Sequence, residues 1–362
     1  KDQSTLIQYP IGKTATSYTF PNSVTTIGEY AFYQCSSLTS IDLSGTQVET
    51  IGQEAFRFCS KITSIDLPNS VTTIDYGAFQ QTGLTSVTLP TNPLFTTIGS
   101  NVFGYCSKIT SLTIPESVTT IGYGAFQQTG LTSIDIPDSV TTIGERAFFF
   151  CFDLTSITLP TNDNFTTISI GCFYGDSGLT SITIPDSVTT IGSNAFNSCT
   201  SLTSITIPDS VETIHYRAFE TCSKLNSIII PDSVTTIDSS AFGAIGSPST
   251  VFVKNVDPND TYTMATLKNT ISGKISGTVT YEQWVDSNAN ANANTAPHTV
   301  TLSDISCNEN TPYTATVSAT DNNGDILTFS LSGADSADFT LSGTTLSAND
   351  VFDFETKETY NI

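Results

Sequence analysis

The phrase IPDSVTTIG at residues 136–144 occurs a second time, without a change, at residues 184–192. Near-copies of it begin at Phe20, Leu67, Ile114, Ile207 and Ile230. Self-similarity at a fixed spacing is the signature of a repeat architecture, in which one small unit is stacked many times. The phrase is therefore predicted to be a structural joint rather than a single binding or catalytic site.

The phrase belongs to a longer repeat, L-T-S-I-x-I-P, D-S-V-T-T-I-G, x-x-A-F-x-x-C. The phenylalanine of the A-F pair, or its equivalent, recurs every 22 to 25 residues, at Phe32, Phe56, Phe79, Phe103, Phe126, Phe148, Phe173, Phe196, Phe219 and Phe242. The alternating first piece predicts a strand, which the following proline ends because it has no backbone N–H. The second piece predicts a turn with Val140 and Ile143 inside, and the third predicts one or two turns of helix. One unit cannot bury its apolar side alone, so stacked units are expected to share a core.

The pattern LTSIxIPxSVTTIGxxAFxxC resembles the leucine-rich repeat of BspA-like surface proteins. These are bacterial and protist cell-surface proteins associated with adhesion. The resemblance implies a leucine-rich repeat solenoid, with a parallel β-sheet on the concave face and short strands, turns and short helices on the convex side. It also implies a bacterial, extracellular, cell-surface location and a protein or glycan ligand.

The patterns divide the chain into five segments. They predict an N-terminal cap hairpin at residues 1–20, the repeat solenoid at 21–253, a C-terminal cap at 254–285, a linker at 286–296 and a β-sandwich at 297–362. The hairpin is inferred from two apolar-polar runs around Pro10, and the linker from its low-complexity DSNANANANTA.

The last segment alternates apolar and polar residues between turn sequences, which favours a β-sandwich of the cadherin/Ig-like kind. Its phrases SATDNNGD and FDFETKETY resemble a bacterial cadherin-like domain, incomplete at Ile362, so we expect a longer parent protein; a strand donated by a neighbouring chain is the alternative. The resemblance implies a calcium site on Glu309, Asp321, Asn323, Asp353 and Glu355. At Asn323 the cadherin-like family has a second aspartate. Asparagine supplies an oxygen without a charge, which weakens a site for Ca²⁺ because this ion prefers several carboxylates. A solvated acidic loop is the other interpretation.

Charge and motifs exclude several classes of function. With 12 Lys and Arg against 34 Asp and Glu, the net charge of −22 repels nucleic acid. No run of eighteen apolar residues provides a membrane span. GxSxG, HExxH and phosphate-loop motifs are absent, and neither His215 nor His298 has a nucleophile partner in the sequence. The sequence therefore predicts that the chain is not an enzyme and that calcium is its only candidate cofactor.

The cysteines follow the repeat rather than a disulfide framework. Six of the eight occupy one slot, three residues after the phenylalanine: Cys35, Cys59, Cys106, Cys151, Cys199 and Cys222. Thr82 and Thr129 fill the same slot elsewhere, and Cys172 replaces the alanine of an A-F pair. A slot that accepts either Cys or Thr predicts small, buried and reduced side chains.

The strand pieces place their T, S and x residues outside. The resulting threonine column is a candidate ligand surface: Thr39, Thr63, Thr85, Thr110, Thr132, Thr155, Thr180 and Thr203. Three interpretations remain open, namely a solvated sheet face, a shallow surface for sugars or matrix protein, and an ice-binding array. Specificity is expected where the repeat varies: the x column, the insertions at residues 91–95 and 161–165, and the caps.

The D-S-V phrases raise a second kind of site. In some bacteria such text carries O-glycans, which would lie on Ser139, Ser187, Ser210 and Ser233; Asp-Ser after Pro is also ordinary turn chemistry. Taken together, the sequence predicts a surface adhesin-type module that makes weak multivalent contacts. The alternative is a structural subunit of an extracellular filament that assembles with copies of itself.

Overall fold

In the computed structural model the chain divides into two units, Lys1–Val285 and Asp286–Ile362. In the first unit the structure describes residues 4–10, 12–225, 227–231, 233–238 and 240–245, together with the strands at 250–254 and 283–284. In the second unit it describes four strands, at 299–302, 314–320, 339–342 and 345–348.

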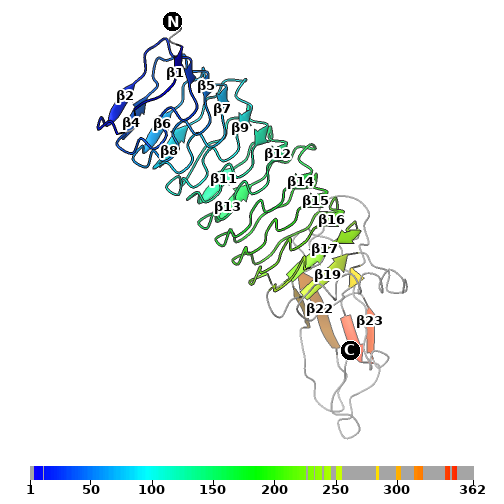
Figure 1. The fold of residues 1–362 in the computed structure, drawn as a ribbon. Coiled ribbons are helices and arrows are strands. Elements are labelled where there is room, and N and C mark those ends of the chain that lie inside the picture. Colours follow the sequence, from blue (N-terminus) through cyan, green and yellow to red (C-terminus); the bar gives the residue numbers. More distant parts are fainter. Residues whose placement is uncertain are drawn as a thin grey trace. The chain divides into compact units, whose positions relative to one another are not determined.

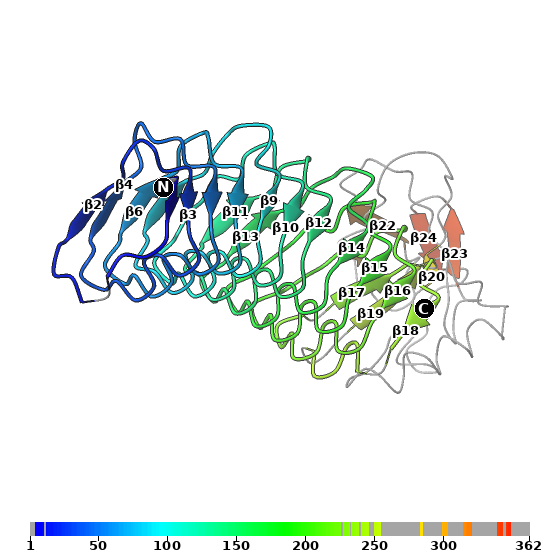
Figure 2. The same cartoon turned by 45° about the horizontal axis from the view of Figure 1, so that its top comes forward.

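The strand pieces of the first unit form a parallel ladder, as predicted (Figures 1 and 2). Between β11 (Ser133–Asp135) and β13 (Ser156–Thr158), for example, Ile134 pairs with Ile157, and both are buried. The period of two along a strand turns the flanking residues outward. The other strands of this first ladder, which is formed in separate pieces, are β2 (Ser17–Thr19), β4 (Ser40–Asp42), β6 (Ser64–Asp66), β8 (Ser86–Thr88), β17 (Ser227–Ile230), β19 (Thr250–Lys254) and β20 (Gln283–Trp284).

A second parallel ladder runs through the T-T-I pieces, where the sequence predicts only a turn. Its strands are two residues long, and equivalent residues pair, as Ile121 pairs with Ile143. They are β1 (Thr5–Leu6), β3 (Thr26–Ile27), β5 (Thr50–Ile51), β7 (Thr73–Ile74), β9 (Thr97–Ile98), β10 (Thr120–Ile121), β12 (Thr142–Ile143), β14 (Thr167–Ile168), β15 (Thr190–Ile191), β16 (Thr213–Ile214) and β18 (Thr236–Ile237). Where both ladders are continuous, each coil is therefore bonded to its neighbours along two sides.

The A-F pieces form successive turns and no helix anywhere in the described coils, so the predicted short helices are wrong. Arg146 and Phe150, two residues to either side of Phe148, have φ angles of 55° and 56°. An α-helix cannot pass through this left-handed conformation. The N–H of Phe148 instead donates to the carbonyl oxygen of Cys172 in the next coil, at 3.0 Å. The turns thus join coil to coil as the ladders do.

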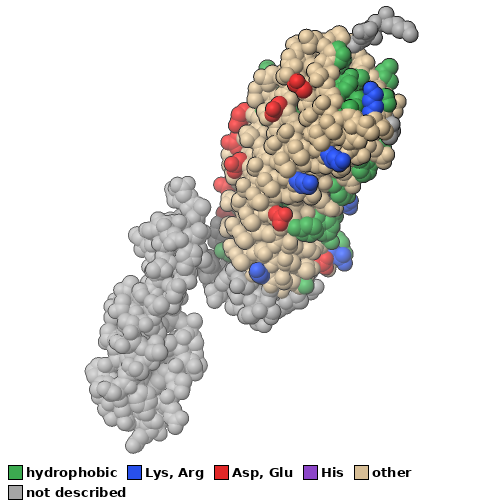
Figure 3. Space-filling model, turned by 90° about the vertical axis from the view of Figure 1, so that its left-hand side faces the viewer, with side chains coloured by type: hydrophobic (Ala, Val, Ile, Leu, Met, Phe, Trp, Pro, Cys, Tyr) green, Lys and Arg blue, Asp and Glu red, His purple; other side chains and the backbone are tan. Residues whose placement is uncertain are grey.

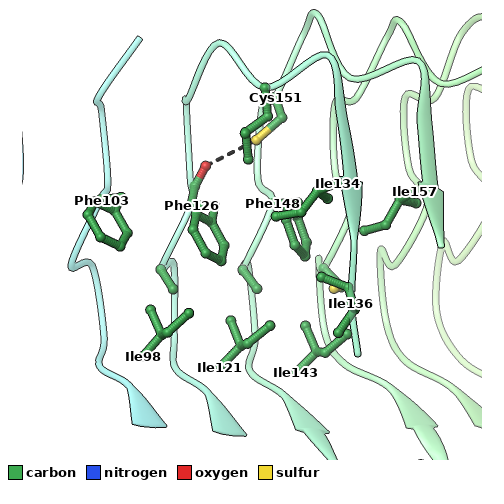
Figure 4. Packing of buried hydrophobic residues seen from close by; sticks show 14 of the residues in the cluster. Ile98, Phe103, Ile121, Phe126, Ile134, Ile136, Ile143, Phe148, Cys151 and Ile157 are labelled. Atoms are coloured by element: carbon green, nitrogen blue, oxygen red, sulfur yellow. Dashed lines mark hydrogen bonds between the residues drawn. The ribbon is translucent and has the colours of Figure 1, made fainter. Parts of the chain in front are cut away.

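A column of stacked phenylalanines fills the core. From Phe32 to Phe242, successive rings lie 5.0 to 5.8 Å apart between centroids and are tilted by only 2° to 16°. Such pairs contribute about 0.5–1.5 kcal/mol each beyond the burial of apolar area. Isoleucines of the two ladders, such as Ile121 and Ile134, line the same interior (Figure 4).

The N-terminal residues cover the first coil, but not as the predicted hairpin. β1 pairs in parallel with β3, and β2 pairs in parallel with β4, so the two strands do not pair with each other. The ring of Tyr9 stacks on Phe32 at 5.2 Å and continues the phenylalanine column. Residues 4–10 and 12–20 therefore belong to a shortened extra coil, because their apolar residues fit the slots of the repeat.

The second ladder is interrupted twice, between β7 and β9 and between β12 and β14. The two interruptions coincide with the insertions at residues 91–95 and 161–165, which lengthen the connection just before the T-T-I piece. An extra length of chain at this point keeps the two-residue strand from reaching its register with the preceding coil.

Both insertions are held by the same device. The Nδ2 of Asn92 donates to the carbonyl oxygens of Asn69 and Val71, both at 2.7 Å. The Nδ2 of Asn162 donates in the same way to Asp138 and Val140, at 2.9 and 2.8 Å. The insertions are thus built into the stack as defined structures.

The second unit contains a four-stranded antiparallel sheet of order β21-β22-β24-β23. Its strands are β21 (Thr299–Leu302), β22 (Thr314–Thr320), β23 (Phe339–Ser342) and β24 (Thr345–Ala348). One sheet does not establish the predicted sandwich or its cadherin-like character, which stay predictions. The linker at 286–296 and nearly all of the cap at 254–285 lie outside the described residues. Among those that are described, no helix has the length and apolar character needed to cross a membrane.

Candidate functional surface

The T, S and x columns of the first ladder form one surface, which we call the hydroxyl face. All eight threonines of the predicted ligand surface are exposed on it. The Oγ1 of Thr39 donates to the carbonyl oxygen of Thr16 in the preceding coil, and that of Thr155 to Thr132, both at 3.0 Å. The same bond recurs at Thr85, Thr132, Thr180 and Thr203. These hydroxyls therefore tie coils together and keep only acceptor lone pairs for a ligand.

Acidic residues of the x column are bonded within the hydroxyl face. The Oγ1 of Thr88 donates to Oδ1 of Asp66, and that of Thr158 to Oδ1 of Asp135, both at 2.6 Å. Hydrogen bonds from Ser44 lower the pKa of Asp42, because they stabilise its charged form. The face therefore combines fixed hydroxyls with fixed negative charge.

The hydroxyl face is hollowed where the first ladder is interrupted between β8 and β11. A depression of about 490 Å³ there is lined by Ser86, Ser111, Ser133, Asp135 and Glu116, among others. The three serines are exposed members of the S column. The lining also contains apolar residues such as Val87 and Leu112, so a ligand here would meet hydroxyls, carboxylates and apolar surface together.

The four serines predicted to carry O-glycans have a structural role. The Oγ of Ser139 donates to the carbonyl oxygen of Val118 at 2.7 Å. Ser187, Ser210 and Ser233 make the equivalent bond at 2.8, 2.7 and 2.8 Å. A glycan on Oγ would remove this donor and leave a part-buried carbonyl without it. Glycosylation of these serines stays a prediction.

A surface formed by the A-F turns, which we call the turn face, carries exposed aromatic rings. The chain has three arginines, and all three stack on rings there. The guanidinium of Arg57 lies 4.7 Å from the ring centre of Phe58, that of Arg217 lies 4.7 Å from Tyr216, and that of Arg146 lies 5.3 Å from Phe149. Tyrosine and arginine are enriched at protein interfaces. The sequence shows these residues only as departures from the repeat, and their stacking on rings was not predicted.

The cysteines of the described part, seven in all, are buried and free, which confirms the prediction for them. The Sγ of Cys59 lies 3.0 Å from the carbonyl oxygen of Phe32, and that of Cys106 lies 3.0 Å from Phe79. Burial raises the pKa of Cys59 to about 12. Since the thiolate is the reactive species, these side chains are structural rather than nucleophilic.

One coil places an aspartate in the cysteine slot, which sequence analysis missed although the spacing marks it. Asp176 is fully buried, and its Oδ1 accepts a hydrogen bond from the N–H of Cys151 at 2.7 Å. Its other oxygen has no hydrogen-bond partner. Burial raises the pKa of this carboxyl well above its usual range. Asp176 is therefore a neutral or strained group of the core, away from any surface site.

His215 is explained by its neighbour. It occupies a slot held by glycine in most coils, and Asp238 occupies the same slot in the next coil. The Nδ1 of His215 and Oδ2 of Asp238 lie 2.9 Å apart. The pair bridges two coils.

The predicted calcium ligands are Glu309, Asp321, Asn323, Asp353 and Glu355. All five lie outside the described residues. Within the part of the chain that the structure describes, no three His, Cys, Asp or Glu side chains are placed to hold a metal ion. The calcium site stays a prediction.

Stacked coils of about 23 residues, joined by parallel ladders around apolar columns, define a leucine-rich repeat solenoid. The family described as the BspA type leucine rich repeat region, in six copies, matches residues 12–95, 78–202 and 166–281. The chain belongs to this family. No curated protein sequence is similar enough to count as a relative.

Three solved structures illustrate the likeness. A leucine-rich repeat protein from Bacteroides ovatus is 27% identical over 75% of this chain and 84% of its own, with a TM-score of 0.42. A leucine rich cell surface protein from Faecalibacterium prausnitzii is 32% identical over 73% and 83%, with a TM-score of 0.41. The pneumococcal vaccine antigen PcpA is 18% identical over 78% and 85%, with a TM-score of 0.47.

Proposed function

We propose that this chain is a non-enzymatic binding module of a bacterial cell surface, and that it binds a protein or glycan through its hydroxyl face. Membership of the BspA-type family supports the surface location. The observation that carries the binding role is the threonine column, whose hydroxyls are fixed by bonds such as Thr155 to Thr132. Successive coils thus repeat the same polar groups at the strand spacing of about 4.8 Å.

The shape and charge of this face favour weak contacts made many times. Its depression at Ser111 is shallow and is lined by polar and aliphatic residues, without the aromatic lining typical of tight small-molecule sites. Identical groups along a rigid array gain avidity when several are engaged at once. The net charge of −22 favours neutral or basic partners.

The test compares two charge-matched variants on beads. The first carries Ser86→Lys, Ser111→Lys and Ser133→Lys on the hydroxyl face. The control carries Thr142→Lys, Thr167→Lys and Thr236→Lys at exposed positions of the second ladder. We expect wild-type beads to bind at least one matrix protein or glycan of a panel, the first variant to lose that binding, and the control to keep it. Equal loss in both variants, or no binding by the wild type, contradicts the proposal.

A filament subunit is the second candidate, and the distribution of charge favours it. Figure 3 shows most acidic side chains of this view gathered along one edge of the described part, hydrophobic side chains along the opposite edge, and Lys and Arg side chains partly at that edge and partly across the middle of the face. Contact between the unlike edges of two copies is heterologous, and such contacts build an open filament when the rotation between copies does not close a ring. Sedimentation and electron microscopy of the purified chain at low salt test this candidate. Fibres that dissolve at high salt support it, and monomers at every salt concentration and at millimolar chain exclude it.

A further inference from the structure

The first interruption of the second ladder opens a groove on the side of the T-T-I strands. The groove lies between β7 and β9 and has a volume of about 660 Å³, within the ~300–1,000 Å³ typical of small-molecule sites. Its lining includes Thr72, Thr73, Asp75, Tyr76, Leu94 and Thr97. The insertion at residues 91–95, which interrupts the ladder, also supplies one wall.

Two apolar groups stand in the groove. The side chain of Leu94 is 71% exposed and that of Tyr76 is 44% exposed, whereas the apolar residues of the repeat are buried in the core. The backbone at Leu94 is held in place because the Oδ1 of Asn92 accepts hydrogen bonds from the N–H groups of Leu94 and Phe95, at 2.8 and 3.1 Å. A leucine fixed in solvent beside a tyrosine ring provides a platform for an apolar surface.

The polar groups of the groove surround this platform. Threonines of two coils line the groove together with Asp75. Asp75 departs from the repeat, since Gly28, Gly52 and Gly99 occupy its slot in neighbouring coils. Burial and the charge of Glu29 raise the pKa of Asp75, because both disfavour its charged form. A hydrogen-bond donor on a ligand would stabilise that charged form.

The second interruption of the ladder, between β12 and β14, serves as an internal comparison. It has the same asparagine device, but Gly144, Glu145 and Asn164 stand where the first has Asp75, Tyr76 and Leu94. The same backbone irregularity therefore occurs once with the apolar platform and once without it. The platform is not a requirement of the insertion itself.

We propose that the groove between β7 and β9 binds one or two neutral pyranose units of a glycan, with the ring face of a sugar on Tyr76 and Leu94 and its hydroxyls bonded to Asp75 and the threonines. A pyranose presents an apolar C–H face and a rim of hydroxyls, which matches a platform surrounded by donors and acceptors. The carboxylate selects against anionic sugars, because Asp75 and Glu29 would repel a second negative charge. This site lies away from the hydroxyl face and does not depend on the function proposed for that face.

Saturation-transfer NMR on the full chain tests the proposal. The probes are the methyl glycosides of glucose, galactose, mannose and N-acetylglucosamine, with glucuronic acid as the charged comparator. We expect at least one neutral glycoside to bind in the millimolar range. Leu94→Asn, which copies the second interruption at an exposed position, and Tyr76→Ala should each weaken that binding at least tenfold.

Matched variants make the test specific. Glu145→Ala and Asn164→Ala, at the second interruption, should leave sugar binding unchanged. The proposal is overturned if no neutral glycoside binds at about 50 mM ligand, which is about ten times a Kd of about 5 mM. It is also overturned if glucuronic acid binds equally well, or if Leu94→Asn binds like the wild type.

Discussion

The Sγ of Cys151 lies 3.1 Å from the carbonyl oxygen of Phe126 in the preceding coil (Figure 4). Cys199 and Cys222 stand in the same relation to Phe173 and Phe196, also at 3.1 Å. The thiol column is thereby bonded to the backbone of the phenylalanine column. A small side chain with one weak donor suits this slot, which explains why threonine can replace cysteine there.

Two substitutions of Cys59 test whether the cysteine slot requires buried volume and a hydrogen-bond donor. Cys59→Thr should change the free energy of unfolding by less than about 1 kcal/mol, because Thr82 and Thr129 already fill this slot in other coils. Cys59→Ala should cost about 1–2 kcal/mol, since it removes both buried volume and the donor to Phe32. Urea unfolding measures both. Equal effects of the two substitutions would show that the hydrogen bond and volume do not matter here.

Shortening a ring of the phenylalanine column should be costly. Phe126 is fully buried and stacks on Phe103 and Phe148, so Phe126→Ala should destabilise the solenoid by about 3–5 kcal/mol. The control is Phe152→Ala, at a ring that is 55% exposed, with an expected change within about 0.5 kcal/mol. Thermal and urea unfolding distinguish the two variants, and similar midpoints would contradict the assigned core.

The stability of the solenoid should depend on pH through Asp176. Its folded pKa is raised by burial, so the folded state holds a proton that the unfolded chain releases above its own pKa near 4. The contribution of Asp176 to stability is therefore complete below its unfolded pKa and is lost as the pH rises through its folded pKa. The total loss is about 1.4 kcal/mol for each pKa unit by which the folded pKa exceeds the unfolded one.

Asp176→Cys restores the residue of the other coils and serves as the matched variant. It should be more stable than the wild type at pH 7.5, and the difference should shrink as the pH falls toward 4.5. Cys151, Cys172 and Cys199, whose thiols surround the carboxyl, are unchanged in this comparison and stay neutral. A difference that does not vary with pH would show that Asp176 does not titrate between the two states.

A left-handed residue in the turns should accept glycine. Thr221 has a φ of 62°, a conformation that costs a β-branched residue dearly, and Gly175 fills the same slot in another coil. Thr221→Gly should therefore stabilise the solenoid by about 1 kcal/mol. Thr203→Gly, at an exposed position beside the first ladder, should instead destabilise it by about 0.5–1 kcal/mol. Opposite signs in urea unfolding confirm the turn geometry.

Sequence patterns predict the columns of this fold better than its connections. The phenylalanine, leucine and isoleucine slots are buried as expected, since the period alone decides which residues meet. The second ladder escapes prediction because two residues such as Thr142–Ile143 are too short to show alternation. The predicted helix fails because A-F-x-x-C spacing fits a helix and a series of turns equally, and only φ at residues such as Arg146 distinguishes them.

Local pattern also explains the error at the N-terminus and the partial success at the surface. Two alternating runs at residues 5–20 do not reveal their partners, so a parallel extra coil looks the same as a hairpin. The exposed threonine column could be predicted, whereas its bonds to the preceding coil depend on the stacking geometry. The insertion at residues 91–95 was predicted to be a place of specificity, but the groove beside Tyr76 requires the three-dimensional structure.

The most direct measurement concerns avidity on the hydroxyl face. Binding of the purified chain to its best target from the panel is measured once with the monomer in solution and once with the chain displayed densely on beads. Weak binding by each chain, strengthened when many displayed chains engage the target at once, predicts a monomer Kd of roughly 10⁻⁴ M or weaker and a gain of about 10²–10⁴ on the beads, abolished by the three lysines at Ser86, Ser111 and Ser133. A monomer Kd in the nanomolar range that changes neither on display nor with those lysines would contradict weak, multivalent binding by the hydroxyl face.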